Sequence, residues 1–117
     1  MSRFIIEGNR NLSGEIRVAG NKNAALPIIA ATVLTDEPCI LENLPDISDV
    51  RSMLAILSDL GKSVEMLSAH KCQITGSVNK SRLNDKLAST LRASILYLSV
   101  LLARTGEVEM VPPGGCV

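Results

Sequence analysis

The sequence predicts an α/β or α+β fold, because segments that alternate like strands are mixed with segments that carry helical stripes. Apolar residues form 46% of the 117 residues and aromatic residues only 2%, so we expect a core of aliphatic side chains. Twelve basic residues balance twelve acidic ones, and no basic run or aromatic platform indicates a nucleic-acid partner. No apolar stretch approaches the roughly 20 residues that span a bilayer, and no signal peptide is recognisable, so we expect no membrane association and a cytoplasmic location.

The first part of the chain predicts a hairpin followed by a helix. Residues 3–7 and 14–18 are typical of two short strands, and residues 8–11 predict the turn between them. Residues 24–34 are rich in Ala, Ile and Leu and predict a helix. Asn23 is its expected N-cap, and Pro27 then falls in the first turn, where a missing N–H costs least.

A strand and the clearest helix follow. Residues 39–43 predict the strand. The helix has apolar residues at i, i+3, i+4 and i+7, with one further member: Val50, Met53, Leu54, Leu57 and Leu60. Asp46 or Ser48 can cap its start, and Gly61 is a typical stop.

The remaining segments complete a β-β-α-β-α-β-β-α-β pattern. Residues 62–67 and 71–75 predict a hairpin, and 77–85 a polar loop. Residues 87–103 predict one long helix that is apolar nearly all round, and therefore buried on most sides. Its main stripe is Leu87, Leu91, Ile95, Leu98 and Leu102. Residues 107–111 predict a last strand.

The segment 20–25 is the first candidate site. It joins a strand to a helix start, where free N–H groups and the positive end of the helix dipole favour an anion. Lys22 adds a compact cation suited to phosphate or carboxylate. The alternative is an ordinary capped helix with a solvated lysine.

Arg92 is the second candidate, because it is a charge within an otherwise apolar helix. Such a charge must be paired, bound to a ligand or close enough to the end to reach water. Arginine binds phosphate through two parallel hydrogen bonds. The alternative is a salt bridge to Asp85 or another carboxylate.

Cys116 is the third candidate, at the end of a loop that contains two prolines and two glycines. A loop thiol beside cations loses its proton easily, and the thiolate is the reactive form. The alternative is a small buried side chain, which is also what we expect for Cys39 and Cys72. The lone His70 is expected to be solvated. The cysteines and His70 lack zinc-ligand spacing, and no cofactor motif occurs, so we expect neither a metal nor a cofactor. An odd number of unpaired cysteines fits a reducing compartment.

Several segments together resemble the enolpyruvyl transferase family, and within it the UDP-N-acetylglucosamine 1-carboxyvinyltransferases. The resemblance runs through the whole chain in order. The matching segments are FIIEG (4–8), LSGEI (12–16), GNKNAALP (20–27), LTDEP (34–38), NLPD (43–46), LRASI (91–95) and PGGC (113–116).

The resemblance implies a reaction and roles for four residues. These enzymes transfer the enolpyruvyl group of phosphoenolpyruvate to the 3-hydroxyl of UDP-N-acetylglucosamine and release phosphate, at the start of peptidoglycan precursor synthesis for the cell wall. Lys22 and Asn23 match the phosphoenolpyruvate-binding pair, and Arg92 matches an arginine near UDP-N-acetylglucosamine. Cys116 matches a mobile-loop cysteine that acts as general acid, forms a covalent adduct and is alkylated by fosfomycin.

The resemblance also implies the domain organisation. The family fold is an inside-out α/β barrel of βαβαββ units, and its members are several times longer than this chain. Residues 1–117 then correspond to an N-terminal fragment, with 1–21 as a hairpin that pairs with a missing C-terminal domain and 22–117 as part of the first barrel domain. The fragment alone is expected to be inactive. A 3-phosphoshikimate 1-carboxyvinyltransferase-like enzyme and an inactive remnant or binding module remain as alternatives.

Overall fold

The computed structural model describes residues 2–114 and combines one small sheet with a layer of helices. The sheet is antiparallel, with strands β1 (Cys39–Leu41), β2 (Ser63–Ser68) and β3 (Lys71–Thr75) in the order β1-β3-β2. The helical segments are α1 (Lys22–Ala31), η1 (Thr32–Leu34), α2 (Ser48–Asp59), α3 (Asp85–Ala88), η2 (Arg92–Ile95) and α4 (Leu96–Thr105). The predicted mixed class of fold is confirmed.

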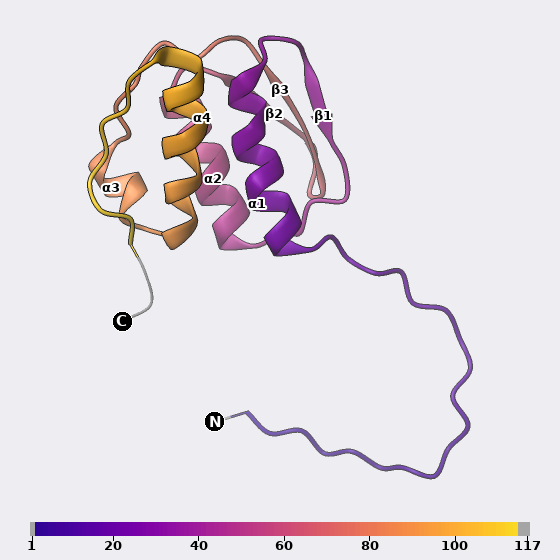
Figure 1. The fold of residues 1–117 in the computed structure, drawn as a ribbon. Coiled ribbons are helices and arrows are strands. Elements are labelled where there is room, and N and C mark those ends of the chain that lie inside the picture. The colour runs from indigo at the N-terminus through magenta and orange to yellow at the C-terminus, as the bar shows by residue number, and fades with distance from the viewer. Residues whose placement is uncertain (1, 115–117) are drawn as a thin grey trace.

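Helices α1, α2 and α4 run side by side on one side of the sheet, and all three begin at the same end of the molecule (Figure 1). This parallel arrangement places the start of α1, the start of α2 and the start of the continuous η2–α4 segment at one end of the molecule. Within the described residues, no helix is long and apolar enough to cross a membrane.

The central strand β3 presents one face to the helices. Cys72 and Ile74 are fully buried, while the residues that alternate with them, Lys71, Gln73 and Thr75, are only partly buried. Ile74 pairs with Cys39 of β1 on one side and with Val64 of β2 on the other. Alternation of this kind is expected of a sheet with a single covered face. The predicted hairpin over 62–67 and 71–75 is confirmed.

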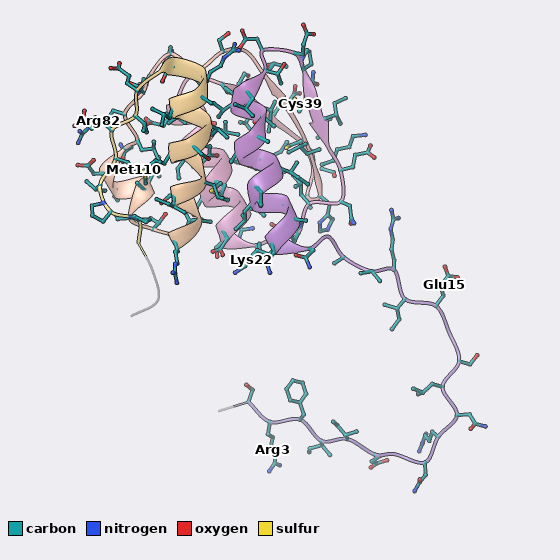
Figure 2. All side chains as sticks on the ribbon, viewed as in Figure 1. Arg3, Glu15, Lys22, Cys39, Arg82 and Met110 are labelled. Carbon is teal, nitrogen blue, oxygen red and sulfur yellow. The ribbon has the colours of Figure 1, made fainter. Side chains whose placement is uncertain are left out.

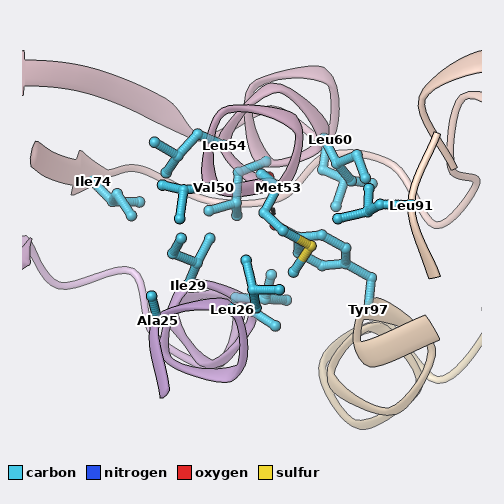
Figure 3. Close-up of a cluster of buried hydrophobic side chains, with 14 of the residues drawn as sticks. Ala25, Leu26, Ile29, Val50, Met53, Leu54, Leu60, Ile74, Leu91 and Tyr97 are labelled. Atoms are coloured by element: carbon cyan, nitrogen blue, oxygen red, sulfur yellow. Dashed lines mark hydrogen bonds between the residues drawn. The ribbon is translucent and has the colours of Figure 1, made fainter. Parts of the chain in front are cut away.

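Helix α2 supplies the middle of the core, as its apolar stripe predicted. Figure 3 shows Val50 and Met53 of α2 between Ile29 of α1 and Tyr97 of α4. Met53, Ile29 and Tyr97 are completely buried. The Tyr97 hydroxyl donates a hydrogen bond of 2.6 Å to the backbone carbonyl of Met53, so the one buried phenol is satisfied.

The start of α1 differs from the expectation. Asn21, not Asn23, is the N-cap, and its side-chain oxygen accepts a hydrogen bond of 2.7 Å from the Asn23 N–H. The helix therefore begins at Lys22, and Pro27 is its sixth residue instead of a first-turn residue. Gly20 makes this start possible, because a Cβ there would lie 1.7 Å from the Asn43 carbonyl oxygen.

The start of α2 also differs. Ile47 occupies the N-cap position without a side-chain hydrogen bond, so the expected cap by Asp46 or Ser48 was wrong. Gly61 does terminate the helix, with a φ of +112° that favours glycine.

The predicted helix over 87–103 is broken. Ser89, Thr90 and Leu91 separate α3 from η2, and α4 begins only at Leu96. The break changes which face points inward: Tyr97 and Leu101 are buried, whereas Ile95, Leu98 and Leu102 of the expected stripe are exposed. The expectation of burial on most sides was therefore wrong.

The two ends of the chain contain less regular structure than predicted. No strand forms within 2–19, where the chain is extended and exposed and extends away from the helices (Figure 1). The radius of gyration of 17.5 Å exceeds the roughly 13 Å of a compact chain of this length. A two-stranded hairpin is marginal without a covering layer, which explains the missing strands at 3–7 and 14–18. At 107–111, a single parallel bridge between Glu109 and Arg82 replaces the predicted strand.

Candidate anion-binding cleft

A cleft of about 610 Å³ opens at the end of the molecule where the three parallel helices begin. Its charged residues and Asn23 come from the starts of three helical segments: Lys22 and Asn23 of α1, Asp49 of α2 and Arg92 of η2. Thr90, just before η2, adds a hydroxyl. Its apolar walls include Leu26, Pro27, Leu91 and Leu96. Three residues singled out from the sequence, Lys22, Asn23 and Arg92, thus lie around one cleft.

The helix ends give this cleft a positive character in addition to its charged side chains. The first N–H groups of a helix lack partners within the helix, and the helix dipole places partial positive charge there. At α1 the Asn21 side chain takes only one of these N–H groups, that of Asn23. Convergence of three such ends on one cleft favours a phosphate or carboxylate.

Lys22 is the first residue of α1, and Figure 2 shows it at the base of that helix. Its ammonium Nζ donates a hydrogen bond of 3.1 Å to Oδ2 of Asp49. The lysine side chain is 52% exposed and that of Asp49 is 36% exposed, so the pair stays accessible to solvent. Lys22 is therefore neither buried nor simply solvated, but held by a carboxylate at the cleft.

Arg92 is exposed and begins η2, immediately after the break in the predicted helix. The expected alternative of a salt bridge to Asp85 is wrong, because Asp85 pairs with Arg82 at 2.9 Å. No carboxylate within the described range 2–114 lies within salt-bridge distance of Arg92. Arg92 lines the same cleft as Lys22.

Cys116 lies outside the described residues, but the loop before it is described as far as Gly114. The Gly114 N–H donates a hydrogen bond of 3.3 Å to the Ala88 carbonyl. A Cβ at Gly114 would lie 1.8 Å from the Ser89 carbonyl oxygen, so only glycine fits here. The loop therefore closes against the helix break, next to Thr90 and Leu91 of the cleft lining.

The other two cysteines have different settings. Cys72 is fully buried in β3, and burial raises the pKa of its thiol. Cys39 is partly buried, and its Sγ lies 3.5 Å from the Glu37 carbonyl. His70 is exposed at the hairpin turn, and its Nδ1 lies 2.7 Å from the Leu44 carbonyl oxygen. None of these three residues lines the cleft.

Asp49 is the residue of the cleft that sequence reasoning missed. Its neighbours Asp46 and Ser48 were considered only as helix caps, and neither one caps. An acidic residue in the first turn of a helix is a common stabilising feature, so its sequence position alone gives no sign of a binding role. Only the packing of α1 on α2 brings it to Lys22.

A mixed α/β fold that gathers helix N-termini and two cations around one cleft is typical of proteins that bind phosphorylated or carboxylated substrates. Comparison with known proteins makes the class specific. Residues 6–117 match the family described as EPSP synthase (3-phosphoshikimate 1-carboxyvinyltransferase), and the chain belongs to this family.

Individual relatives within this family are more specific about the type of enzyme. The chain is 48% identical over 116 residues to UDP-N-acetylglucosamine 1-carboxyvinyltransferase 1 of Carboxydothermus hydrogenoformans, and 46% identical over 119 residues to UDP-N-acetylglucosamine 1-carboxyvinyltransferase of Treponema denticola. These matches cover 99% and 100% of this chain but only 27% and 28% of the relatives. The chain thus spans little more than a quarter of their length.

A solved structure supports the same conclusion for the fold. The crystal structure of the enolpyruvyl transferase NikO from Streptomyces tendae matches with a TM-score of 0.70 and 26% sequence identity. The match covers 85% of this chain and 23% of that protein. The resemblance to enolpyruvyl transferases that the sequence motifs indicated is confirmed.

Proposed function

We propose that this chain is the N-terminal part of a UDP-N-acetylglucosamine 1-carboxyvinyltransferase. The complete enzyme transfers the enolpyruvyl group of phosphoenolpyruvate to the 3-hydroxyl of UDP-N-acetylglucosamine and releases phosphate, in the cytoplasm, for peptidoglycan precursor synthesis. The observation that carries the proposal is the grouping of Lys22, Asn23 and Arg92 around one cleft at converging helix N-termini. The names of relatives at 46–48% identity support the choice of substrates.

In this proposal each residue acts on a defined part of the substrates. Lys22 and Asn23 bind phosphoenolpyruvate, whose phosphate and carboxylate suit the ammonium and the α1 N-terminus. Arg92 lies beside UDP-N-acetylglucosamine. Cys116 donates a proton to the methylene carbon of phosphoenolpyruvate as the sugar oxygen bonds to the adjacent carbon, and loss of phosphate and of that proton restores the double bond.

A second candidate is enolpyruvyl transfer to 3-phosphoshikimate, which the description of the matching family favours. Both reactions use phosphoenolpyruvate, so they differ only in the acceptor. Asn21, Asn23 and Cys116 favour the sugar nucleotide, because the shikimate enzymes typically have serines around the early lysine and lack the Pro-Gly-Gly-Cys loop. Phosphate release measured with each acceptor separately distinguishes the two.

We also propose that residues 1–117 do not catalyse the reaction alone. They contain no assigned general base for the sugar hydroxyl, and the matched relatives are more than three times longer. Residues 1–21 would pair with a further domain, which is consistent with the exposed apolar side chains of the extended segment. Phosphate release by the isolated chain that depends on Cys116 would contradict this proposal.

The binding role of Lys22 can be tested by replacing Lys22 with alanine in the full-length protein that contains this segment. Loss of one charge-assisted hydrogen bond, about 1.5–3 kcal/mol, should weaken phosphoenolpyruvate binding roughly 10- to 150-fold and affect UDP-N-acetylglucosamine less. Lys80→Ala is the matched control, because Lys80 is 51% exposed and also ion-paired, to Asp59, but lies outside the cleft. Equal phosphoenolpyruvate affinities for Lys22→Ala and the parent would rule the role out.

A further inference from the structure

We propose that Asp49 is a positioning residue of this cleft: its carboxylate holds the Lys22 ammonium in place for phosphoenolpyruvate. The inference rests on the proposed function and adds a residue to it. Asp49 and Lys22 come from different helices, yet both line the cleft, and they are joined by a contact of 3.1 Å.

The carboxylate is the more firmly placed partner. Asp49 is the second residue of α2, and α2 packs against α1 through fully buried side chains such as Met53 and Ile29. A carboxylate in a first helical turn is also stabilised by the helix dipole. Its side chain has only two rotatable bonds, so its position follows the backbone of α2.

Lys22, in contrast, needs an anchor. Its flexible four-carbon stem leaves many rotamers open, and fixing such a side chain costs up to roughly 2 kcal/mol in conformational entropy. Within the described residues, the Lys22 ammonium donates its side-chain hydrogen bond to Asp49. Because the carboxylate also lines the cleft, the ammonium that it holds stays at the cleft instead of turning into solvent.

Asp49 has a second, opposite effect, because its negative charge repels an incoming anion. The effect of the negative charge and the effect of the carboxylate's position therefore have to be measured separately. Asp49→Glu changes only the position, since it keeps the charge and moves the carboxylate by one methylene. Asp49→Asn removes the charge with almost no change in shape. Asp46→Glu and Asp46→Asn are matched controls, because Asp46 forms an exposed ion pair with Arg51 beside the same helix start but does not line the cleft.

Two measurements on the full-length protein test the proposal: phosphoenolpyruvate affinity, and the rate of acetylation of Lys22 mapped by mass spectrometry without substrate. We expect Asp49→Glu to weaken phosphoenolpyruvate binding about two- to fivefold and to speed acetylation of Lys22 by a similar factor, as loss of an exposed ion pair implies. UDP-N-acetylglucosamine affinity should stay unchanged, as should both readouts in the Asp46 variants.

The possible outcomes separate this inference from the proposed function. A parent protein that does not bind phosphoenolpyruvate would remove both. A parent that binds it, with an Asp49→Glu variant that binds equally well, would remove the inference alone. Tighter binding by Asp49→Asn together with an unchanged Asp49→Glu would assign Asp49 a purely electrostatic effect and overturn its positioning role. Unchanged acetylation of Lys22 in Asp49→Glu would do the same.

Discussion

The hydroxyl of Tyr97 donates a hydrogen bond to the Met53 carbonyl and so joins α4 to the middle of α2. Both residues are completely buried, so the phenol cannot exchange this partner for water without opening the core. The η2 segment, which begins with Arg92, runs directly into α4. The contact therefore bears on the position of Arg92 as well as on stability.

Tyr97→Phe should lower the free energy of unfolding by about 0.5–1.5 kcal/mol, because it removes the hydrogen bond and keeps the ring. Chemical denaturation measures the difference. Ser99→Ala on the same helix is the control, since the Ser99 hydroxyl is exposed and bonds only within its own turn. An unfolding free energy for Tyr97→Phe equal to that of the parent would show that the bond contributes nothing.

Stability should fall in alkali because of the same tyrosine. Burial raises the pKa of Tyr97 well above its ordinary value of about 10. Above pH 10 the unfolded chain loses this proton while the folded chain keeps it, so the contribution is complete below pH 10 and is lost as the pH rises towards the folded pKa. The slope approaches 1.4 kcal/mol per pH unit.

The measurement is a series of denaturation curves at increasing pH, compared between the parent and Tyr97→Phe. The comparison matters because burial lowers the pKa of Lys62, which works in the opposite direction below pH 10.5. Tyr97 is the only tyrosine, so tyrosinate absorbance reports its ionisation directly. Ionisation at pH 10 in the folded protein would contradict the prediction.

Asn21→Ala should destabilise the start of α1 by about 0.5–2 kcal/mol, since the side chain caps the Asn23 N–H. Hydrogen exchange at that amide should quicken, and unfolding should become easier. Asn21→Asp or Asn21→Ser keeps an acceptor oxygen and should restore most of the loss. Exchange at Asn23 that is equally slow in Asn21→Ala would mean that the cap is not formed in solution.

Thiol labelling should distinguish the three cysteines. Cys72 is buried and its pKa is raised, so it should resist alkylation in the folded protein. We predict that Cys116 reacts first, and with fosfomycin in the full-length protein, whereas Cys39 reacts slowly. Mass-mapped alkylation at low reagent measures the order. Preferential labelling of Cys72 under native conditions would show that the sheet opens readily.

The periodicity of apolar residues was sufficient to predict the elements in which that periodicity is regular. The α2 stripe and the β2–β3 hairpin were predicted because their apolar residues follow helical or alternating periods. The break at Ser89–Leu91 has no local signal. There the Ala88 carbonyl accepts hydrogen bonds from the Ser94 hydroxyl, at 2.8 Å, and from the distant Gly114 N–H. A nearby side chain and a backbone N–H from a distant part of the chain thus replace the regular helical bond, which sequence periodicity cannot indicate.

Some residues of the candidate site could likewise be predicted from the sequence, and one could not. Lys22 could be singled out because it stands at the start of a predicted helix, and Arg92 because it is a charge within an apolar segment. Asp49 could not, because an acidic residue at a helix start is ordinary and its meaning depends on a neighbour 27 residues away. The predicted role of Cys116 remains a prediction, because it lies beyond the described residues.

The extended segment before α1 has a consequence for handling the protein. Arg3, Arg10 and Arg17 are exposed there in irregular chain, whereas Lys22 is already within a helix. Trypsin should therefore trim this segment under native conditions. Because 2–19 add no buried contact, the trimmed protein should melt as cooperatively as the parent, within about 0.5 kcal/mol. The trimmed protein should also aggregate less than the parent, since trimming removes several exposed apolar side chains. One of them is Phe4, which is 95% exposed.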